Sequence, residues 1–348
     1  MSRAIAGRGH SKPPTLAEVA ALAGVSVPTA SRVLNGGVRG AKSGTSELRD
    51  RVLDAANALG YTPSPAAQTM KGGRANTIAL LTSDIEDAGS ATMIAGVMHA
   101  AERRGLSVAV RATLDDRGRE LSLLRALRGE RHRGVIIATS RTSVMERERK
   151  VQEELLQLQK QGARIVVIGD SSFGFSSVTV DNYENARRLA EGLVASGAKR
   201  FALVAGPVEQ LTSQRRLDGF VAGLASVGSP VAVVHDAFSR DGGYRAVHTL
   251  TPKLQGLDVI AAMSDGMAVG ARVKVRELGM DRSQHLEISG FDSVPVISDL
   301  WPEFSTVEVP LEAFGESAVA LAVDNESGAV DSVTLRAHPV VHGLRLGA

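Results

Sequence analysis

Hydrophobic positions change their spacing near residue 76, and the change predicts two kinds of structure. Between residues 15 and 60, apolar residues recur every three or four positions in short runs, which is the spacing of amphipathic helices. From residue 76 onward, short and mostly apolar runs alternate with longer amphipathic segments. That alternation predicts buried parallel strands connected by helices. We therefore expect a small helical module followed by a large α/β region.

The first amphipathic stretch, TLAEVAALAGVSVPTASRVLN, predicts two short helices joined by a tight turn. Thr15 is placed to cap the first helix, with Glu18 three residues later as its reciprocal partner. Gly24 is expected to end that helix in the left-handed conformation. Ser26 is expected to cap the second helix by accepting a hydrogen bond from the Thr29 N–H. A third helix is expected over residues 45–59.

The second of these helices has two predicted faces. Its inner face is expected to pack on the first helix through Val25, Ala30, Val33 and Leu34. The residues expected to face outward are Val27, Pro28, Thr29, Ser31, Arg32 and Asn35. The outward face carries hydrogen-bonding groups, one cation and no acid, which suits a recognition helix in the DNA major groove. An ordinary αα-hairpin with a solvated polar face is the alternative.

The same stretch resembles a family signature. The pattern A-x-x-A-G-V-S-x-x-T-x-S-R-V-L-N is that of LacI-type (lactose-repressor-like) transcription regulators, and the chain matches it at Ala20, Ala23, Gly24, Val25, Ser26, Thr29, Ser31, Arg32, Val33, Leu34 and Asn35. The resemblance continues to the C-terminus and is sharpest in GARIVVIGD, RLDGF and ISGFD. It implies an all-α helix-turn-helix head followed by an α/β periplasmic-binding-protein-like core. That core would contain two doubly wound parallel-sheet subdomains, with three chain crossings between them.

Duplex DNA is the partner that the resemblance implies for the head. The DNA-binding residues predicted here are Thr15, Ser26, Val27, Pro28, Thr29, Ser31, Arg32, Asn35, Met70 and Lys71. Arg32 would supply most of the base-specific hydrogen bonding, with a guanine edge as its best partner. The stretch 63–71, PSPAAQTMK, matches the family's hinge helix, which forms on the operator and pushes an apolar side chain, here Met70, into the minor groove. A plain interdomain linker is the alternative.

Strand and helix patterns predict how the chain is divided. Strands are expected at 77–82, 106–111, 134–139, 164–168, 201–205, 231–235, 259–262 and 287–291, with a crossing strand at 178–180. The expected division is a flexible basic arm at 1–14, a DNA-binding domain at 15–62, a hinge helix and linker at 63–75, a first subdomain at 76–176 plus 309–327, and a second subdomain at 177–308 plus 328–348. The later crossings are expected near 305–310 and 325–331.

Ligands of paired α/β subdomains lie between them, at the carboxyl ends of strands. The effector-binding residues predicted on this basis are Ser83, Ser140, Asp170, Arg216, Phe238, Ser264 and Asp292. The resemblance implies effector contacts for Arg216 and Asp292, which we expect on opposite sides of the cleft, holding the hydroxyls of a polyol. Phe238 would stack on a sugar face, or else belong to the core. Asp265 is expected to cap the helix that follows it.

Two departures from the family pattern bear on the effector. Residues 87–91 read DAGSA where the family often has N-P-F-F, so no aromatic side chain is present there to sandwich a ring. Ser264-Asp265 stands where many members have Asn-Asp. These differences predict a pocket that is more polar and more open than a purine-binding one, and a small sugar or sugar derivative is our hypothesis for its ligand.

Charge and composition narrow the function further. The chain has 348 residues and a net charge of +2, but the first 75 residues carry ten Lys/Arg against four Asp/Glu. A basic head on a mildly acidic body fits nucleic-acid contact at one end. The sequence contains no cysteine, so disulfides and thiolate metal sites are excluded. The first residues lack a signal peptide's apolar core and no apolar run is long enough for a membrane span, so we expect a cytoplasmic protein.

Enzyme motifs are not found in the sequence. No G-x-S-x-G, H-E-x-x-H, or G-x-G-x-x-G after a strand is present, so we expect neither catalysis nor a cofactor or metal. The C-terminal VVHGLRLGA has no leucine heptad, which predicts a homodimer without a tetramerising coiled coil. We predict a repressor that binds a near-palindromic operator and responds to a sugar-like effector. A periplasmic-type solute-binding protein, a sugar-acting enzyme and a transcriptional activator are the alternatives.

Overall fold

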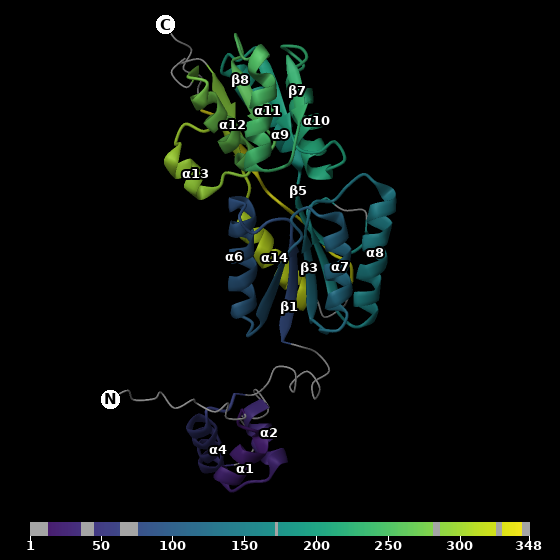
Figure 1. The fold of residues 1–348 in the computed structure, drawn as a ribbon, viewed down its shortest axis with the longest axis vertical. Helices are drawn as coiled ribbons and strands as arrows, with labels where there is room; N and C mark the ends of the chain where they lie inside the picture. Colours follow the sequence, from purple (N-terminus) through teal and green to yellow (C-terminus); the bar gives the residue numbers. More distant parts are fainter. Residues whose placement is uncertain are drawn as a thin grey trace, which may run out of the picture. The chain divides into compact units, whose positions relative to one another are not determined.

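The protein is described by a computed structural model that covers residues 13–35, 45–62, 76–170, 173–280, 286–324 and 329–342. The chain divides into two compact units, residues 1–75 and 76–348, each of which is described by itself (Figure 1). The predicted basic arm up to residue 12, the hinge helix at 63–75 with Met70 and Lys71, and the side chain of Asn35 lie outside the described residues.

The described part of the head contains the three predicted helices, α1 (Leu16–Ala23), α2 (Val27–Asn35) and α4 (Ser46–Leu59) (Figure 1). The predicted capping box is confirmed: the Thr15 N–H donates to Glu18 Oε2 at 2.7 Å, and the Glu18 N–H donates to Thr15 Oγ1 at 3.3 Å. Gly24 ends α1 with φ +65°, and the Thr29 N–H donates to Ser26 Oγ at 3.4 Å, as predicted. These local hydrogen bonds satisfy N–H groups that a helix leaves free at its start.

Small apolar side chains form the core of the head. The fully enclosed members are Val19, Ala20, Ala23, Ala30, Val52, Ala55 and Ala56. Because five of these seven are alanines, the helices pack with little side-chain volume between them. Val25, Val33 and Leu34 pack against this core from α2 and the turn before it, which confirms the predicted inner face.

The first subdomain of the larger unit is built on a six-stranded sheet in which all neighbouring strands are parallel. The strand order is β11 (Ser332–Leu335), β5 (Ser176–Val180), β4 (Arg164–Ile168), β3 (Gly134–Ala138), β1 (Thr77–Thr82) and β2 (Ser107–Ala112). Helices α6 (Ala88–Glu102) and α14 (Leu311–Val323) cover one face, and α7 (Arg117–Leu127) and α8 (Met145–Lys160) cover the other (Figure 1). Covering both faces explains why β1 is a continuous apolar run rather than an alternating one.

The second subdomain contains a four-stranded parallel sheet with the order β7 (Ala232–His235), β6 (Phe201–Ala205), β8 (Val259–Ala262) and β9 (Glu287–Ser289). Helices α9 (Asn182–Ala195) and α10 (Leu211–Gly223) pack on one face, while α11 (Arg240–Leu250) and α12 (Asp265–Glu277) pack on the other. The short helix α13 (Pro295–Leu300) follows β9. An antiparallel pair, β10 (Thr306–Glu308) and β12 (His338–Val340), packs against α9.

Two predicted boundaries between the subdomains are wrong. Residues 177–180 and 332–335 were expected in the second subdomain, but β5 pairs with β4, and β11 pairs with β5, in the first sheet. The chain therefore first passes from the first subdomain to the second after β5. Its last passage between the subdomains lies between β11 and β12, and not at 325–331 as predicted. Burial alternates along β5 and β11, as it does in strands with only one covered face, so their sequences do not reveal which sheet they join.

Candidate functional site

The exposed face of α2 carries the predicted base-reading residues. Val27 is 43% exposed, and Pro28 and Arg32 are exposed beside it. The Arg32 Nε donates to the Pro28 carbonyl at 3.4 Å, which lays the guanidinium along this face. The Thr29 hydroxyl lies 2.8 Å from Ser26 Oγ at the start of the helix. The face therefore presents apolar surface and one long cation.

Ser31 is a correction to the predicted outward face. Its side chain is only 5% exposed, so it offers little surface to DNA in this conformation. Ser31 lies next to Ala30 and one turn before Leu34, at the flank of the buried stripe of α2. A side chain as small as serine at that flank is covered by its neighbours, whereas a longer one would extend past them.

A cavity of about 840 Å³ lies between the two subdomains and receives residues from both. Six of the seven predicted effector residues line it: Ser83, Ser140, Arg216, Phe238, Ser264 and Asp292. Four of them lie within three residues of a strand end. Ser83 directly follows β1, Ser140 and Ser264 lie two residues past β3 and β8, and Phe238 lies three residues past β7. The cavity thus lies at the carboxyl ends of the strands, where parallel α/β sheets place their ligands.

Arg216 on α10 is the most constrained polar side chain of the cavity wall. It is 6% exposed. Its Nε donates to Asn182 Oδ1 at 2.9 Å, its Nη1 donates to the Met263 carbonyl at 2.9 Å, and its Nη2 forms an ion pair with Asp292 Oδ1 at 2.9 Å. The guanidinium also stacks over the ring of Phe291, 3.8 Å from its centre. The prediction that Arg216 and Asp292 lie on opposite sides of the cleft is wrong, because they pair with each other within the second subdomain.

Asp292 is held in an unusual backbone conformation at this pair. Its φ is +126°, and its N–H donates to the Val307 carbonyl at 3.0 Å. Burial raises the pKa of the Asp292 carboxyl to about 7, and the nearby carboxylates of Asp265 and Asp87 act in the same direction, while the Arg216 guanidinium opposes them. Removing a carboxylate from water disfavours its charged form, so a ligand that supplies positive charge here would be favoured.

Asp265 has a structural role that differs from the prediction. Its carboxylate is fully buried, and it accepts hydrogen bonds from the Val294 N–H and from Thr306 Oγ1, each at 2.8 Å. It ties α12 to the segment after β9 and to the first residue of β10. The cap of α12 is instead Ser264, whose Oγ accepts from the Met267 N–H at 3.2 Å. The expectation that Asp265 caps this helix is therefore wrong.

Asp170 and Phe238, both predicted to bind the effector, also make contacts that support the structure around the cavity. Asp170 does not line the cavity, but its Oδ2 accepts from Asn182 Nδ2 at 3.2 Å. Because Asn182 lines the cavity and holds Arg216, Asp170 positions a lining residue from behind. Phe238 is half-buried, packs against the cores on both faces of the second sheet, and also lines the cavity. Phe238 therefore belongs to the edge of the core, and its stacking on a sugar stays a prediction.

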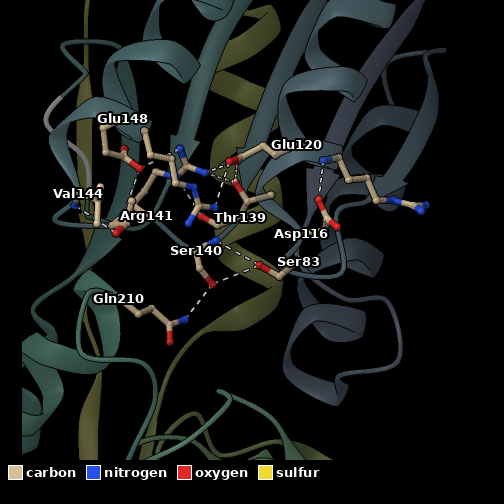
Figure 2. A network of polar contacts seen from close by, with 12 residues as sticks. Ser83, Asp116, Glu120, Thr139, Ser140, Arg141, Val144, Glu148 and Gln210 are labelled. Carbon is tan, nitrogen blue, oxygen red and sulfur yellow. Dashed lines mark hydrogen bonds and ion pairs between the residues drawn. The ribbon is translucent and has the colours of Figure 1, made fainter.

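A set of contacts joins the subdomains at the edge of the cavity, and we call residues 140–143 and 209–211 the interlobe clasp. Figure 2 shows Gln210 reaching Ser140, with Nε2 donating to Ser140 Oγ at 2.8 Å, and the Ser140 N–H donating to Ser83 Oγ at 3.1 Å. The Ser143 N–H donates to the Glu209 carbonyl at 2.8 Å, and the Leu211 N–H donates to the Arg141 carbonyl at 3.0 Å. Sequence reasoning missed Gln210, because its position before α10 carries no motif.

A buried ion cluster lies behind the clasp in the first subdomain (Figure 2). Arg141 and Glu120 form an ion pair at 3% and 1% exposure. Glu120 also accepts from Thr139 Oγ1 at 2.6 Å, and Arg147 Nη2 lies 3.2 Å from Glu120 Oε2. Glu148 lies 3.5 Å from the Arg141 Nη1 and accepts from the backbone at the clasp, and burial raises the pKa of its carboxyl. The cluster fixes the conformation of the strand end that carries the clasp.

Comparison with known proteins identifies the family. A model described as periplasmic binding proteins and sugar binding domain of LacI family matches residues 75–325, and a model described as bacterial regulatory proteins, lacI family, matches residues 15–64. The chain belongs to the LacI family. The head that matches residues 15–64 sets it apart from a periplasmic-type solute-binding protein.

Relatives from this family share the full arrangement. The HTH-type transcriptional regulator CelR of Thermobifida fusca is 28% identical over 326 residues, which cover 90% of this chain and 92% of CelR. The catabolite control protein A of Priestia megaterium is 26% identical over 313 residues, which cover 88% of this chain and 91% of that protein. Both alignments include the head and the core, so the LacI-family chain resembles whole regulators rather than a single domain.

Solved structures match the fold. The lac repressor dimer bound to operator and an anti-inducer has a TM-score of 0.80 at 24% identity, covering 97% of this chain and 100% of that one. A complex of the transcriptional regulator CelR with cellobiose has a TM-score of 0.66 at 26% identity, covering 95% and 99%. The helix-turn-helix head and the α/β core with parallel sheets are those of this family.

Among the described residues, the LacI-family chain offers neither a membrane span nor a metal centre. No helix there is both long and apolar enough to cross a bilayer. No group of three or more His, Asp or Glu side chains within those ranges is arranged to hold a metal ion.

Proposed function

We propose that this LacI-family regulator represses transcription in the cytoplasm by binding a near-palindromic operator as a homodimer. The observation that carries the proposal is the exposed face of α2, which combines apolar surface with the single cation Arg32 and no carboxylate. A related regulator of known structure is a dimer bound to its operator. A two-fold dimer reads two half-sites, so the operator would be near-palindromic.

Arg32 reads a guanine in this proposal, and its removal tests the assignment. DNA fragments bound by the purified protein are sequenced first, to define the operator. Arg32→Ala then costs about 1–3 kcal/mol on that operator and relaxes discrimination at one position. Arg51→Ala is the matched control, because Arg51 is an exposed arginine on α4 of the same head. An Arg32→Ala protein with unchanged affinity and base preference would remove the assignment.

Thr15, Ser26 and Thr29 contribute phosphate contacts in the proposal, since they lie at the starts of α1 and α2, where helix N-termini favour anions. Asn35 is proposed for the same role, and Met70 with Lys71 for the minor groove. Ser31 is left out of the contact set because it is buried. A methionine side chain inserted between two stacked base pairs would unstack that base step and bend the operator.

The effector in this proposal is a small sugar or sugar derivative that binds in the cavity between the subdomains. Serine hydroxyls, the Arg216–Asp292 pair and the ring of Phe238 together offer hydrogen bonds and one stacking face, which is what a polyol ring requires. The related CelR has been solved with cellobiose. A thermal-shift screen tests the class: stabilisation by sugars supports it, and stabilisation by nucleobases alone contradicts it.

In this proposal the effector controls operator binding by shifting the population between two relative orientations of the subdomains. The cavity is bounded by both subdomains, so a ligand that contacts both favours one relative orientation of them. In a homodimer that orientation sets the spacing of the two hinges, and coupling of this kind is typically about 1–3 kcal/mol. Operator affinity measured with and without effector gives the sign of the coupling. We propose no catalytic step for the cavity.

A further inference from the structure

Carboxylates outnumber cations on the wall of the effector cavity. The acidic side chains among its described lining residues are Asp84, Glu86, Asp87, Asp115, Asp241 and Asp292. The basic ones in the same lining are Arg216 and Arg240. Charges of one sign around a concave site determine which ligands collect there, so the balance of this wall disfavours an anionic ligand.

Both cations of the wall are already engaged. Arg216 is paired with Asp292, hydrogen-bonded to Asn182, and stacked on an aromatic ring. Arg240 is paired with Asp241, its Nη1 lying 3.0 Å from Asp241 Oδ1. The carboxylate of the neighbouring Asp241 offsets the charge of the exposed Arg240, as Asp292 offsets that of Arg216. Each cation of the wall is therefore matched by a carboxylate, and four further carboxylates remain, those of Asp84, Glu86, Asp87 and Asp115.

The first subdomain contributes carboxylates without any cation. Within the described ranges of the chain, Asp84, Glu86, Asp87 and Asp115 form no ion pair. Asp84 Oδ1 accepts from the Glu86 N–H at 2.9 Å, and Asp87 Oδ2 accepts from the Ser90 N–H at 2.8 Å. Backbone donors hold these carboxylates in place while leaving their charges uncompensated.

Asp87 reaches across toward the second subdomain. A Cβ placed on Gly266, in the first turn of α12, would lie 3.2 Å from Asp87 Oδ1. The Asp87 charge is also close enough to Asp292 to help raise the pKa of that carboxyl. Two carboxylates from opposite subdomains thus face a common region of the cavity.

Side chains cap two of the helix N-termini at the cavity. Asp87 caps α6 and Ser264 caps α12 with its side-chain oxygen. Gln210, which is 7% exposed and belongs to the same wall, leaves its Oε1 acceptor without a hydrogen-bond partner among the described residues. The wall therefore has acceptors to spare, which matches a ligand rich in donors.

We propose that the effector is a hydroxylated ligand carrying a protonated amine, of the amino-sugar class, whose ammonium lies between Asp87 and Asp292. An ammonium supplies three donors and no acceptor, and it adds the positive charge that the wall lacks. Hydroxyls of the same ligand meet the serines and Gln210, and its apolar face meets Phe238. This inference rests on the proposed carbohydrate effector and specifies its charge.

Calorimetric titration of the full-length protein with matched sugars tests the charge. Glucose, galactose and mannose are each used in four forms: the neutral parent, the 2-amino sugar, its N-acetyl derivative and the uronic acid. At least one amine is expected to bind about 10-fold or more tightly than its N-acetyl derivative, because an ionic hydrogen bond replaces a neutral one. The preference is expected to shrink as salt is added.

Asp87→Asn assigns the effect to one carboxylate. Asparagine caps helices as well as aspartate does, so the start of α6 is preserved while the charge is removed. The variant is expected to lose most of the preference for the amine while binding the N-acetyl derivative as before. Asp218→Asn is the control, since Asp218 is exposed on α10 and does not line the cavity. The preference of the Asp218→Asn protein for the amine over the N-acetyl derivative is expected to match that of the unmodified protein.

Three results would overturn the inference. Tighter binding of a uronic acid than of any amine contradicts the proposed charge, as does equal binding of amine and N-acetyl forms. In both cases the carbohydrate effector stands. If no sugar in any form binds, the proposed effector class fails and this inference fails with it.

Discussion

The buried pair of Glu120 and Arg141 gives a quantitative test of what supports the interlobe clasp. The perturbation is Glu120→Gln, which removes one charge and keeps the size of the side chain. In the native protein Glu120 compensates Arg141 and accepts from Arg147 and Thr139. After the change, the Arg141 guanidinium keeps Glu148 at 3.5 Å as its remaining acidic neighbour among the described residues.

The expected cost follows from burial. Both side chains are almost completely excluded from water. Breaking a buried ion pair by removing one partner typically costs about 3–5 kcal/mol, because an uncompensated charge is left in a medium that solvates it poorly. Glu120→Leu combined with Arg141→Met removes both charges of the pair, and Arg147 and Glu148, which each lose one partner, still attract each other. That double variant is expected to be more stable than Glu120→Gln.

Urea titration measures the effect in the full-length protein. The chain has a single tryptophan, Trp301, which lies in the second subdomain and stacks on Phe304, so its fluorescence follows the core and not the head. Circular dichroism recorded in parallel tests whether the two subdomains unfold together. Glu146→Gln on the neighbouring helix α8 is the control, because the partners of Glu146 among the described residues are the exposed Arg149 and Lys150. This variant is expected to match the unmodified protein.

A loss below about 1 kcal/mol for Glu120→Gln would refute the reasoning, since it would mean that water reaches the guanidinium. So would a double variant that is as unstable as the sum of its single changes, because the two charges would then not interact.

Three further predictions concern a helix crossing, a cap and a titrating group. Gly243→Ala places a Cβ 2.0 Å from a backbone carbonyl oxygen of α12 and is expected to cost about 3 kcal/mol in urea titrations. Gly118→Ala, at an exposed position of α7 where the Cβ would make only an ordinary contact, is expected to be neutral or slightly stabilising, and equal effects would contradict the packing argument. Thr15→Ala removes the cap of α1 and is expected to cost the head about 1 kcal/mol, measured as faster amide hydrogen exchange in α1 with exchange in the α/β core unchanged. Thr15→Ser is expected to restore the slow exchange, and unchanged exchange in the alanine variant would exclude the cap. Asp292 has a raised pKa, so its contribution to stability is full below about pH 4 and is lost as the pH rises toward about 7. Asp292→Asn is therefore expected to flatten the stability profile of the core over that range, and an unchanged profile would rule out this titration.

Local interactions made the helical head predictable from sequence. The capping box of Thr15 and Glu18, the left-handed Gly24 and the contact of Ser26 with Thr29 all join residues within a few positions of one another. Their geometry follows from helix formation itself and needs no knowledge of the surrounding fold. The strands 77–82, 164–168, 201–205 and 259–262 were predicted with the bounds that the structure has, because strands covered on both faces are continuous apolar runs.

The cavity was predictable in outline and not in its chemistry. Parallel sheets place ligands at the carboxyl ends of their strands, which located Ser83, Ser140 and Ser264 correctly at the wall. Whether Arg216 faces Asp292 across the cleft or pairs with it depends on how α10 packs beside the end of β9, and the two residues lie far apart in the sequence. Sequence spacing carries no information about such a contact.

The sequence by itself determined the helices of the head, the order of strands and helices, and the family to which the chain belongs, because these depend on local hydrogen bonds and on the pattern of apolar positions. Tertiary structure alone decided the burial of Ser31, the sheet that β5 and β11 join, the ion pair of Glu120 with Arg141, and the clasp at Gln210. Each of these depends on which distant surface covers a residue. Burial and pairing are therefore properties of the packed chain, whereas periodicity and capping are properties of a short segment.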